Sequence, residues 1–217
     1  MDITTMLGML CEGLLVSAQI FCVALLGSLP LGVLVALGRM SKFKPLALLM
    51  RLYISVMRGT PLMLQLLAIN FGPFYLFGIQ LDSEWKFSAT YIAFILNYAA
   101  YFGEIYRSGI QSIPRGQHEA ANVLGYTRAQ TFMKIVLPQV IKRILPAMSN
   151  EIITLVKDTS LAFVLSIPEM MSVSKSLAAR EAGMMPYVFA GIIYWCFNFV
   201  VEWVLNRVEK KLDYYHD

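Results

Sequence analysis

Charged residues are scarce in this chain. Of its 217 residues only 15% are Asp, Glu, Lys or Arg, whereas 58% are hydrophobic. A soluble globular domain carries about 25% charged residues, so the composition argues against that class. The sequence predicts a membrane protein that forms a single domain over residues 1–217.

Cysteine clusters and nucleotide-binding loops are also missing. Cys11, Cys22 and Cys196 stand singly in apolar stretches, so we expect them to pack as small side chains rather than to form disulfides or metal sites. The chain has no phosphate loop ending in Gly-Lys-Ser or Gly-Lys-Thr, and therefore no evident ATP site. Energy for active work must come from a partner or an ion gradient. The first five residues lack the positive charge of a cleavable signal, so the first apolar segment is expected to remain as an anchor.

Long apolar segments predict where the chain crosses the membrane. About 20 helical residues cross a hydrocarbon core of about 30 Å. Candidate crossings lie at approximately residues 14–38, 59–78, 87–106, 144–167 and 184–206. The fourth of these contains Glu151, Lys157 and Asp158, so hydropathy alone leaves it ambiguous.

The distribution of basic residues resolves that ambiguity. With five crossings and an external amino terminus, the Lys and Arg residues of 39–58, 107–143 and 207–211 face the cytoplasm. With four crossings, the basic central loop or the basic tail would lie outside, against the positive-inside rule. We therefore predict an all-α protein of five transmembrane helices in the cytoplasmic membrane, with its amino terminus outside and its carboxyl terminus in the cytoplasm.

A stripe of small residues marks the first crossing. Ala24, Ser28, Gly32 and Ala36 recur at every fourth position. Small residues let helices approach closely in lipid, where packing replaces the hydrophobic drive. The stripe predicts a helix–helix contact.

A polar hairpin is predicted at about residues 114–127. Pro114 ends the preceding helix, and residues 116–124 form a helix of about 13 Å. Gly125 supplies the left-handed stop. The sequence Thr-Arg-Ala-Gln at 127–130 is a capping box that begins the next helix.

A helix this short does not persist alone in water, so its apolar residues must be buried. These are Ala120, Ala121 and Leu124. Two interpretations fit: a surface loop on the bilayer, in which Glu119 favours the positive end of the helix dipole, or a docking element for a cytoplasmic partner.

The hairpin carries a spaced signature of Glu-Ala-Ala at 119–121, Gly125, Ile135 and Leu-Pro at 137–138. It resembles the EAA signature of permease subunits in bacterial binding-protein-dependent ATP-binding-cassette importers, and each defining position matches. The stretches RGTPL with Gln65, AAYFGEIYRSGIQSIPRGQHEAA and NEIITLVKDTSL are similar to the polar amino acid group of that family. The resemblance covers approximately residues 13–208.

The resemblance implies a type I importer permease in which the EAA helix is a short cytoplasmic coupling helix. In that family this helix sits in a groove of a separate ATPase, and closure of the paired ATPases switches the membrane helices between inward-open and outward-open states. The residues implied for coupling are Gly116, Glu119, Ala120, Ala121, Leu124 and Gly125.

The implied partners are an ABC ATPase dimer, a second copy of the chain or a paralogous permease, an extracytoplasmic amino acid-binding protein, an amino acid and membrane lipid. ATP and Mg²⁺ belong to the ATPase, so no cofactor, metal or nucleic acid is expected on this chain.

The charges of the fourth crossing form the candidate solute site. Ionisable groups in a membrane are costly unless they pair or face a wet path. Glu151 and Asp158 are suited to an ammonium or a cationic side chain, and Lys157 either neutralises one of them or holds a carboxylate. An internal Lys157–Asp158 ion pair is the structural alternative. The resemblance adds Asn97 and Gln65 to the translocation path.

Three other charged residues are not assigned to the site. Glu104 and Arg107 are spaced for a helix-surface ion pair. Arg58 resembles a family position at the inner end of its crossing, with a role in either gating or packing.

Two other classes remain. An ion-coupled secondary transporter of a small polar solute is the alternative, although such folds have paired repeats that this chain lacks. A membrane enzyme using Glu151 and Asp158 lacks a nucleophile, metal set or cofactor loop.

Overall fold

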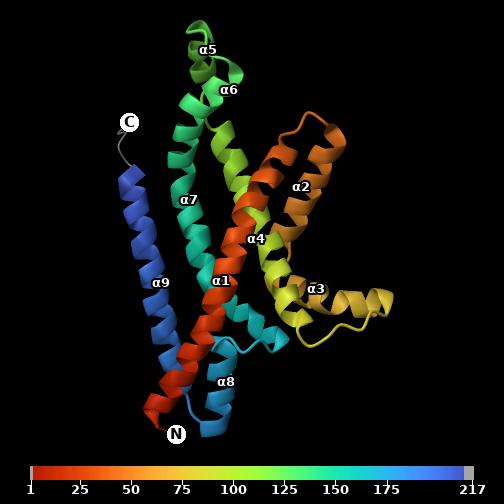
Figure 1. Cartoon of the computed structure of the whole chain (residues 1–217), viewed down its shortest axis with the longest axis vertical. Coiled ribbons are helices and arrows are strands. Elements are labelled where there is room, and N and C mark those ends of the chain that lie inside the picture. The colour runs from red at the N-terminus through yellow and green to blue at the C-terminus, as the bar shows by residue number, and fades with distance from the viewer. Residues whose placement is uncertain (1, 213–217) are drawn as a thin grey trace.

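The structure is a computed structural model that describes residues 2–212. Over these residues all regular elements are helical, as the sequence predicts. The helices form an elongated bundle, with a polar hairpin at one end and the amino terminus at the other (Figure 1). Residues 1 and 213–217, which include the end of the predicted cytoplasmic tail, lie outside the described part.

Helix α1 runs the length of the bundle. It spans Ile3–Arg39, and 37 residues at about 1.5 Å each extend over roughly 55 Å. This exceeds a hydrocarbon core of about 30 Å, so α1 is tilted or emerges from it. It begins well before the predicted start at residue 14. Its main partner is α4, Trp85–Gln111, which contains the predicted third crossing.

The small-residue stripe of α1 faces α4. Ala24, Ser28, Gly32 and Ala36 are all buried. A methyl group added at Gly32 would stand 2.9 Å from Cβ of Phe102 on α4. The close helix contact predicted from the stripe is confirmed.

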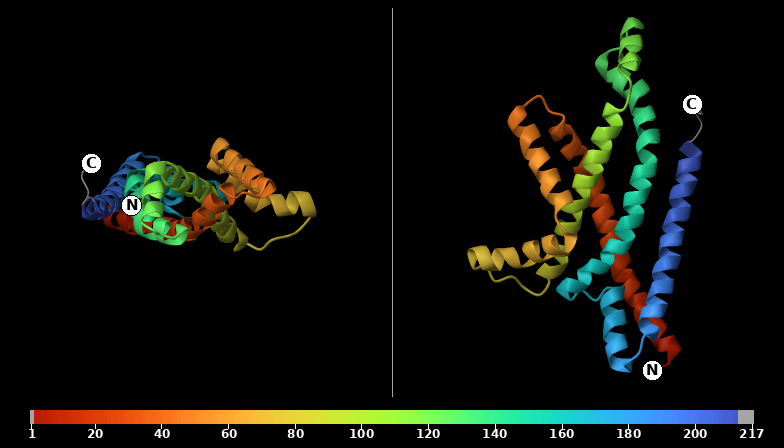
Figure 2. Two further views of the ribbon diagram at one scale, coloured as in Figure 1. Left: turned by 90° about the horizontal axis from the view of Figure 1, so that it is seen from above. Right: turned by 180° about the vertical axis from the view of Figure 1, so that it is seen from behind.

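The second crossing is bent. Helix α2, Lys44–Gly59, descends beside α1 and α4, and α3, Leu62–Phe77, leaves it at 110° and projects sideways (Figures 1 and 2). Thr60 is extended with φ −121° and ψ 148°, because Pro61 disfavours a helical residue before it. The sequence predicted an inner loop up to residue 58 and a crossing that starts at residue 59, whereas residues 44–59 form helix α2. With 16 residues, α3 extends only about 24 Å.

The remaining helices complete the bundle. Helix α7, Leu137–Asp158, continues as a 3-10 segment at Thr159–Leu165, and α8, Met170–Glu181, packs against α1. Helix α9, Met185–Leu212, packs on α7 and α8. By length and apolar composition, α1 and α9 qualify alone as membrane spans and the α2–α3 pair as a broken one.

The core lies where α1, α4 and α7 meet. Phe94, Tyr98 and Phe102 project from one side of α4, and Ile20 and Leu155 pack with them. The cysteines Cys11, Cys22 and Cys196 are free and exposed on the surface of the bundle, not packed inside as expected.

Candidate functional site

The predicted hairpin forms at the end of the bundle opposite the amino terminus (Figure 1). Its first helix, α5, spans Arg115–Val123. Gly125 has φ +78°, and the Tyr126 N–H donates to the Ala121 carbonyl at 3.0 Å. The left-handed stop expected at Gly125 is confirmed.

A capping box begins the next helix. Thr127 Oγ1 accepts the Gln130 N–H at 3.3 Å, and Gln130 Oε1 accepts the Thr127 N–H at 2.9 Å. This cap, predicted from the sequence, opens α6, Arg128–Thr131. The turn is therefore fixed by local bonds.

A π-helical turn at Phe132–Val136 joins α6 to α7. It precedes Pro138, whose ring lacks an N–H and crowds the carbonyl four residues earlier, and the wider turn relieves that conflict. The Gln139 side-chain amide donates to the Ile135 carbonyl at 2.8 Å and lies 3.4 Å from Gln117 Oε1 on α5. These bonds tie the hairpin to the long helix behind it.

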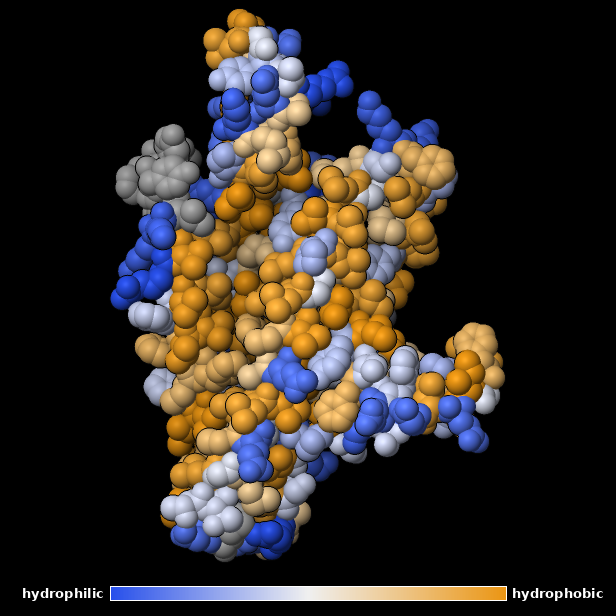
Figure 3. Space-filling model, in the orientation of Figure 1, coloured by the Kyte–Doolittle hydropathy of each residue, from blue (hydrophilic) through white to orange (hydrophobic). Residues whose placement is uncertain are grey.

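The tip of the hairpin is apolar and uncovered. Val123 is 87% exposed and Leu124 is 74% exposed, whereas Ala121 is 1% exposed. Apolar atoms are visible at the end of the hairpin in Figure 3. The expectation that Ala120, Ala121 and Leu124 are all buried holds within this chain only for Ala121, because the other two point to the exterior. Gly116 and Glu119 are exposed as well.

Two carboxylates, Glu151 and Asp158, lie on one face of α7, two helical turns apart. Tyr98 of α4, which is buried, donates its hydroxyl to Asp158 Oδ2 at 2.7 Å. Glu151 is half-buried. Within residues 2–212 its carboxylate has no hydrogen-bond or ion-pair partner. Glu151 therefore has unused acceptor capacity beside a satisfied Asp158.

Lys157 neighbours this pair only by adjacency in the sequence, and its positive charge acts on Asp158 without a direct ion pair. Its side chain is exposed, and no salt bridge joins it to Asp158 in the described part of the chain. The internal ion pair that the sequence offered as an alternative does not form, because Asp158 turns to Tyr98 on α4.

Arg58 lies in the last turn of α2, next to Tyr101 of α4. Its guanidinium stands 5.1 Å from the centre of the Tyr101 ring, and its charge acts on Glu151. The role of Arg58 in gating or packing stays a prediction, and this residue is exposed in the last turn of α2.

Gln65 and Asn97 brace the break between α2 and α3. Gln65 Nε2 donates to the carbonyls of Met57 and Thr60, at 3.0 and 3.2 Å. Asn97 Nδ2 also donates to the Met57 carbonyl at 3.0 Å and to Gln65 Oε1 at 2.9 Å. Both side chains are buried. They satisfy carbonyls that the helix break leaves free.

The expected surface pair forms at the end of α4 nearest the hairpin. Arg107 binds Glu104 through both ends of its guanidinium, with Nε 2.9 Å from Oε2. The ion pair predicted from their spacing is confirmed.

Glu169 is a polar centre that the sequence analysis missed. Its carboxylate is fully buried and caps α8 by accepting the N–H groups of Met171 and Ser172, both at 2.7 Å. It also accepts the Tyr194 hydroxyl of α9 at 3.1 Å and lies 3.5 Å from Ser17 Oγ of α1. Burial raises the pKa of this carboxyl, and the two backbone bonds partly offset that rise. Its position before an apolar helix start was the available signal.

Comparison with known families gives one match. Residues 28–214 match the family described as binding-protein-dependent transport system inner membrane component.

Curated relatives extend over nearly the same length. The arginine transport system permease protein ArtQ of Bacillus subtilis is 37% identical over 93% of this chain and 91% of its own length. The L-cystine transport system permease protein TcyB of the same organism is 39% identical over 85% of this chain and 78% of its own length. A putative glutamine transport system permease protein, GlnP of Rickettsia bellii, is 33% identical over 93% of this chain and 91% of its own length.

Solved structures share the fold. An amino acid ABC transporter crystallised with histidines superposes with a TM-score of 0.86 at 32% identity, covering 97% of this chain and 99% of the other. The MetNI methionine ABC transporter in an inward-facing conformation gives a TM-score of 0.69 at 16% identity, covering 98% and 99%. The predicted type I importer permease fold is confirmed.

Proposed function

Because the chain belongs to the family of inner membrane components of binding-protein-dependent transport systems, we propose that it is the permease subunit of an ATP-driven amino acid importer. The observation that carries this proposal is the match over nearly its whole length to relatives named for arginine, cystine and glutamine transport. Nothing specific favours the alternative of an ion-coupled transporter.

The α5–α6 hairpin couples the permease to its ATPase. ATP and Mg²⁺ bind a separate ATPase dimer, and a groove on that dimer receives the tip of the hairpin. Burying a leucine side chain contributes about 1.5–3 kcal/mol, and Val123 and Leu124 are exposed and available for that contact. The Gln139 bonds connect movement of the tip to α7, which carries the two acids.

The solute passes beside Glu151 and Asp158. An ammonium group is common to all amino acids, and two carboxylates on one helix face attract it. Tyr98 holds Asp158 in place, and Glu151 offers its unused oxygens. Arg58 balances the Glu151 charge when no solute is bound. Gln65 and Asn97, expected in this path, act here as braces of the adjacent helix break.

The assembly follows from the same function. The amino terminus lies outside the cytoplasmic membrane and the hairpin lies in the cytoplasm. The chain works beside a second permease, which is either its own copy or a paralogue, and receives its amino acid from an extracytoplasmic binding protein.

The test is uptake in proteoliposomes that contain the permease, its ATPase and its binding protein. We expect uptake of one or more labelled amino acids that requires ATP at the hairpin side. The double variant Val123→Ser, Leu124→Ser should lower ATPase co-purification and uptake by about tenfold or more, the equivalent of losing about 1.4 kcal/mol of contact.

The matched control is Met184→Ser. Met184 is 70% exposed but lies at the opposite end of the bundle, so ATPase binding should be unchanged. Uptake that proceeds without ATP and follows an ion gradient would refute the proposed function, whereas normal ATPase binding by the double variant would refute only the coupling role of the tip.

A further inference from the structure

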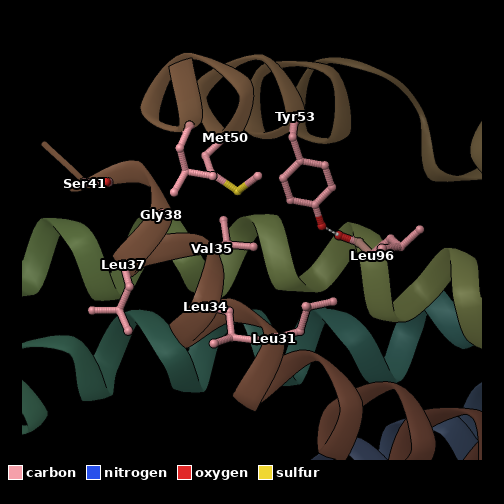
Figure 4. Close-up of a pocket in the computed structure, with 10 residues that line it drawn as sticks. Leu31, Leu34, Val35, Leu37, Gly38, Ser41, Met50, Tyr53 and Leu96 are labelled. Carbon is pink, nitrogen blue, oxygen red and sulfur yellow. Dashed lines mark hydrogen bonds between the residues drawn. The ribbon is translucent and has the colours of Figure 1, made fainter. Parts of the chain in front are cut away.

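An apolar groove of about 540 Å³ opens between α1 and α2 (Figure 4). Leu31, Leu34 and Leu37 line it from α1, and Leu46 and Met50 line it from α2. The groove is separate from the carboxylates of α7 and from the hairpin, so neither the solute site nor the ATPase contact explains it.

The interior of the groove has no unmet polar group to attract water. Its one aromatic hydroxyl, Tyr53, donates to the Leu96 carbonyl of α4 (Figure 4). Gly38 lets the two helices approach, because a methyl group added there would stand 2.9 Å from Cγ of Met50. A dry, open channel of this kind suits a hydrocarbon chain.

Basic residues occupy the turn from α1 to α2, on either side of the groove residue Ser41. Ser41 lines the groove at this end. Lys42 and Lys44 flank the turn, are exposed, and form no salt bridge among residues 2–212. Arg39 is half-buried beside them. An apolar channel thus ends at unpaired positive charge.

We propose that this groove binds one acyl chain of an anionic phospholipid, with the headgroup phosphate at Lys42 and Lys44. The turn lies towards the hairpin end of the bundle (Figure 1), so the lipid comes from the cytoplasmic leaflet, which carries anionic lipids. Basic clusters beside membrane helices on that side attract such headgroups.

Charge argues against a second copy of this chain as the occupant. In a two-fold symmetric contact the same patch lies on both subunits. A contact centred on the groove would bring Lys42 and Lys44 towards their own copies, and like charges across an interface are unfavourable. A phosphate group complements them instead.

The test compares two tryptophan reporters on α1. Leu34→Trp places the reporter in the groove, and Leu26→Trp is the control, since Leu26 is 71% exposed, close to the 64% of Leu34, and lies outside the groove. Each variant is reconstituted with phosphatidylglycerol or phosphatidylcholine carrying brominated acyl chains, which quench tryptophan fluorescence. The three native tryptophans give a baseline that is measured in the parent chain.

The expected result is a preference for the anionic lipid of about fivefold or more at position 34 and no preference at position 26. The double variant Lys42→Gln, Lys44→Gln should abolish the preference at 34, whereas Lys210→Gln, Lys211→Gln at the end of α9 should leave it intact. Equal preference at both reporters, or an absence of quenching at 34 that indicates a protein cover, would overturn the proposal.

Discussion

At the scale of single residues, Glu151 and Asp158 have different surroundings although they share one face of α7. Asp158 accepts the Tyr98 hydroxyl, which partly compensates a buried charge. Glu151 receives no such bond within the described chain and has the charge of Arg58 for balance. A carboxylate with free acceptors at membrane depth is costly unless a ligand or water meets it, so Glu151 is the stronger candidate for contact with the solute.

The variant Glu151→Gln tests this assignment. It keeps the size of the side chain and removes the charge. A hydrogen bond to a charged group contributes about 1.5–3 kcal/mol, so the KM of uptake should rise about tenfold or more while the purified complex stays assembled. Glu202→Gln changes an exposed carboxylate of α9 and should leave KM unchanged. If Glu151→Gln has the wild-type KM, Glu151 does not contact the solute and serves only in helix packing.

At the scale of elements, the break between α2 and α3 is held by side chains from two helices. Gln65 and Asn97 both reach the Met57 carbonyl, and they bind each other. The break brings Arg58 next to Tyr101 and turns α3 away from the bundle. Bent helices in membranes require such substitute partners.

Removing this brace should destabilise the fold and leave solute affinity unchanged. Gln65→Leu removes the acceptor of the buried Asn97 amide and the donor to the Thr60 carbonyl, whereas the Met57 carbonyl keeps Asn97. An unpaired buried polar group costs about 1–3 kcal/mol, so the purified protein should unfold at a lower temperature with the same KM. Gln80→Leu, in the exposed turn after α3, serves as the control. If Gln65→Leu raises the KM without lowering the unfolding temperature, Gln65 belongs to the translocation path and is not only a structural brace.

At the scale of the whole molecule, the hairpin and the α8–α9 turn lie at opposite ends of the bundle (Figure 1). The positive-inside rule predicts that the hairpin lies in the cytoplasm. In a chain with Cys11, Cys22 and Cys196 replaced by serine, Met184→Cys should react with an impermeant maleimide in intact spheroplasts, and Val123→Cys should react only after permeabilisation. Labelling of Val123→Cys in intact spheroplasts, with Met184→Cys labelled only after permeabilisation, would show that the orientation is the opposite.

The sequence by itself determined the features that rest on neighbouring residues. Hydropathy indicated a helical membrane protein, Gly125 and the Thr127–Gln130 box gave the hairpin its ends, and the small-residue stripe indicated a helix contact. These signals each lie within one continuous stretch of the chain, so they do not depend on how distant helices pack. The EAA resemblance then indicated the family that the comparisons confirmed.

Only the tertiary structure decided which distant residues meet. Asn97 binds Gln65 across 32 positions, Tyr98 binds Asp158 across 60, and Ser17 approaches Glu169 across 152. The sequence grouped Lys157 with Asp158 because they are adjacent, but adjacent residues on a helix point in different directions. Residues 44–59, expected in an inner loop, likewise form helix α2, which brings Arg58 next to Tyr101 of α4. Such contacts depend on how whole helices cross, and no local pattern encodes that geometry.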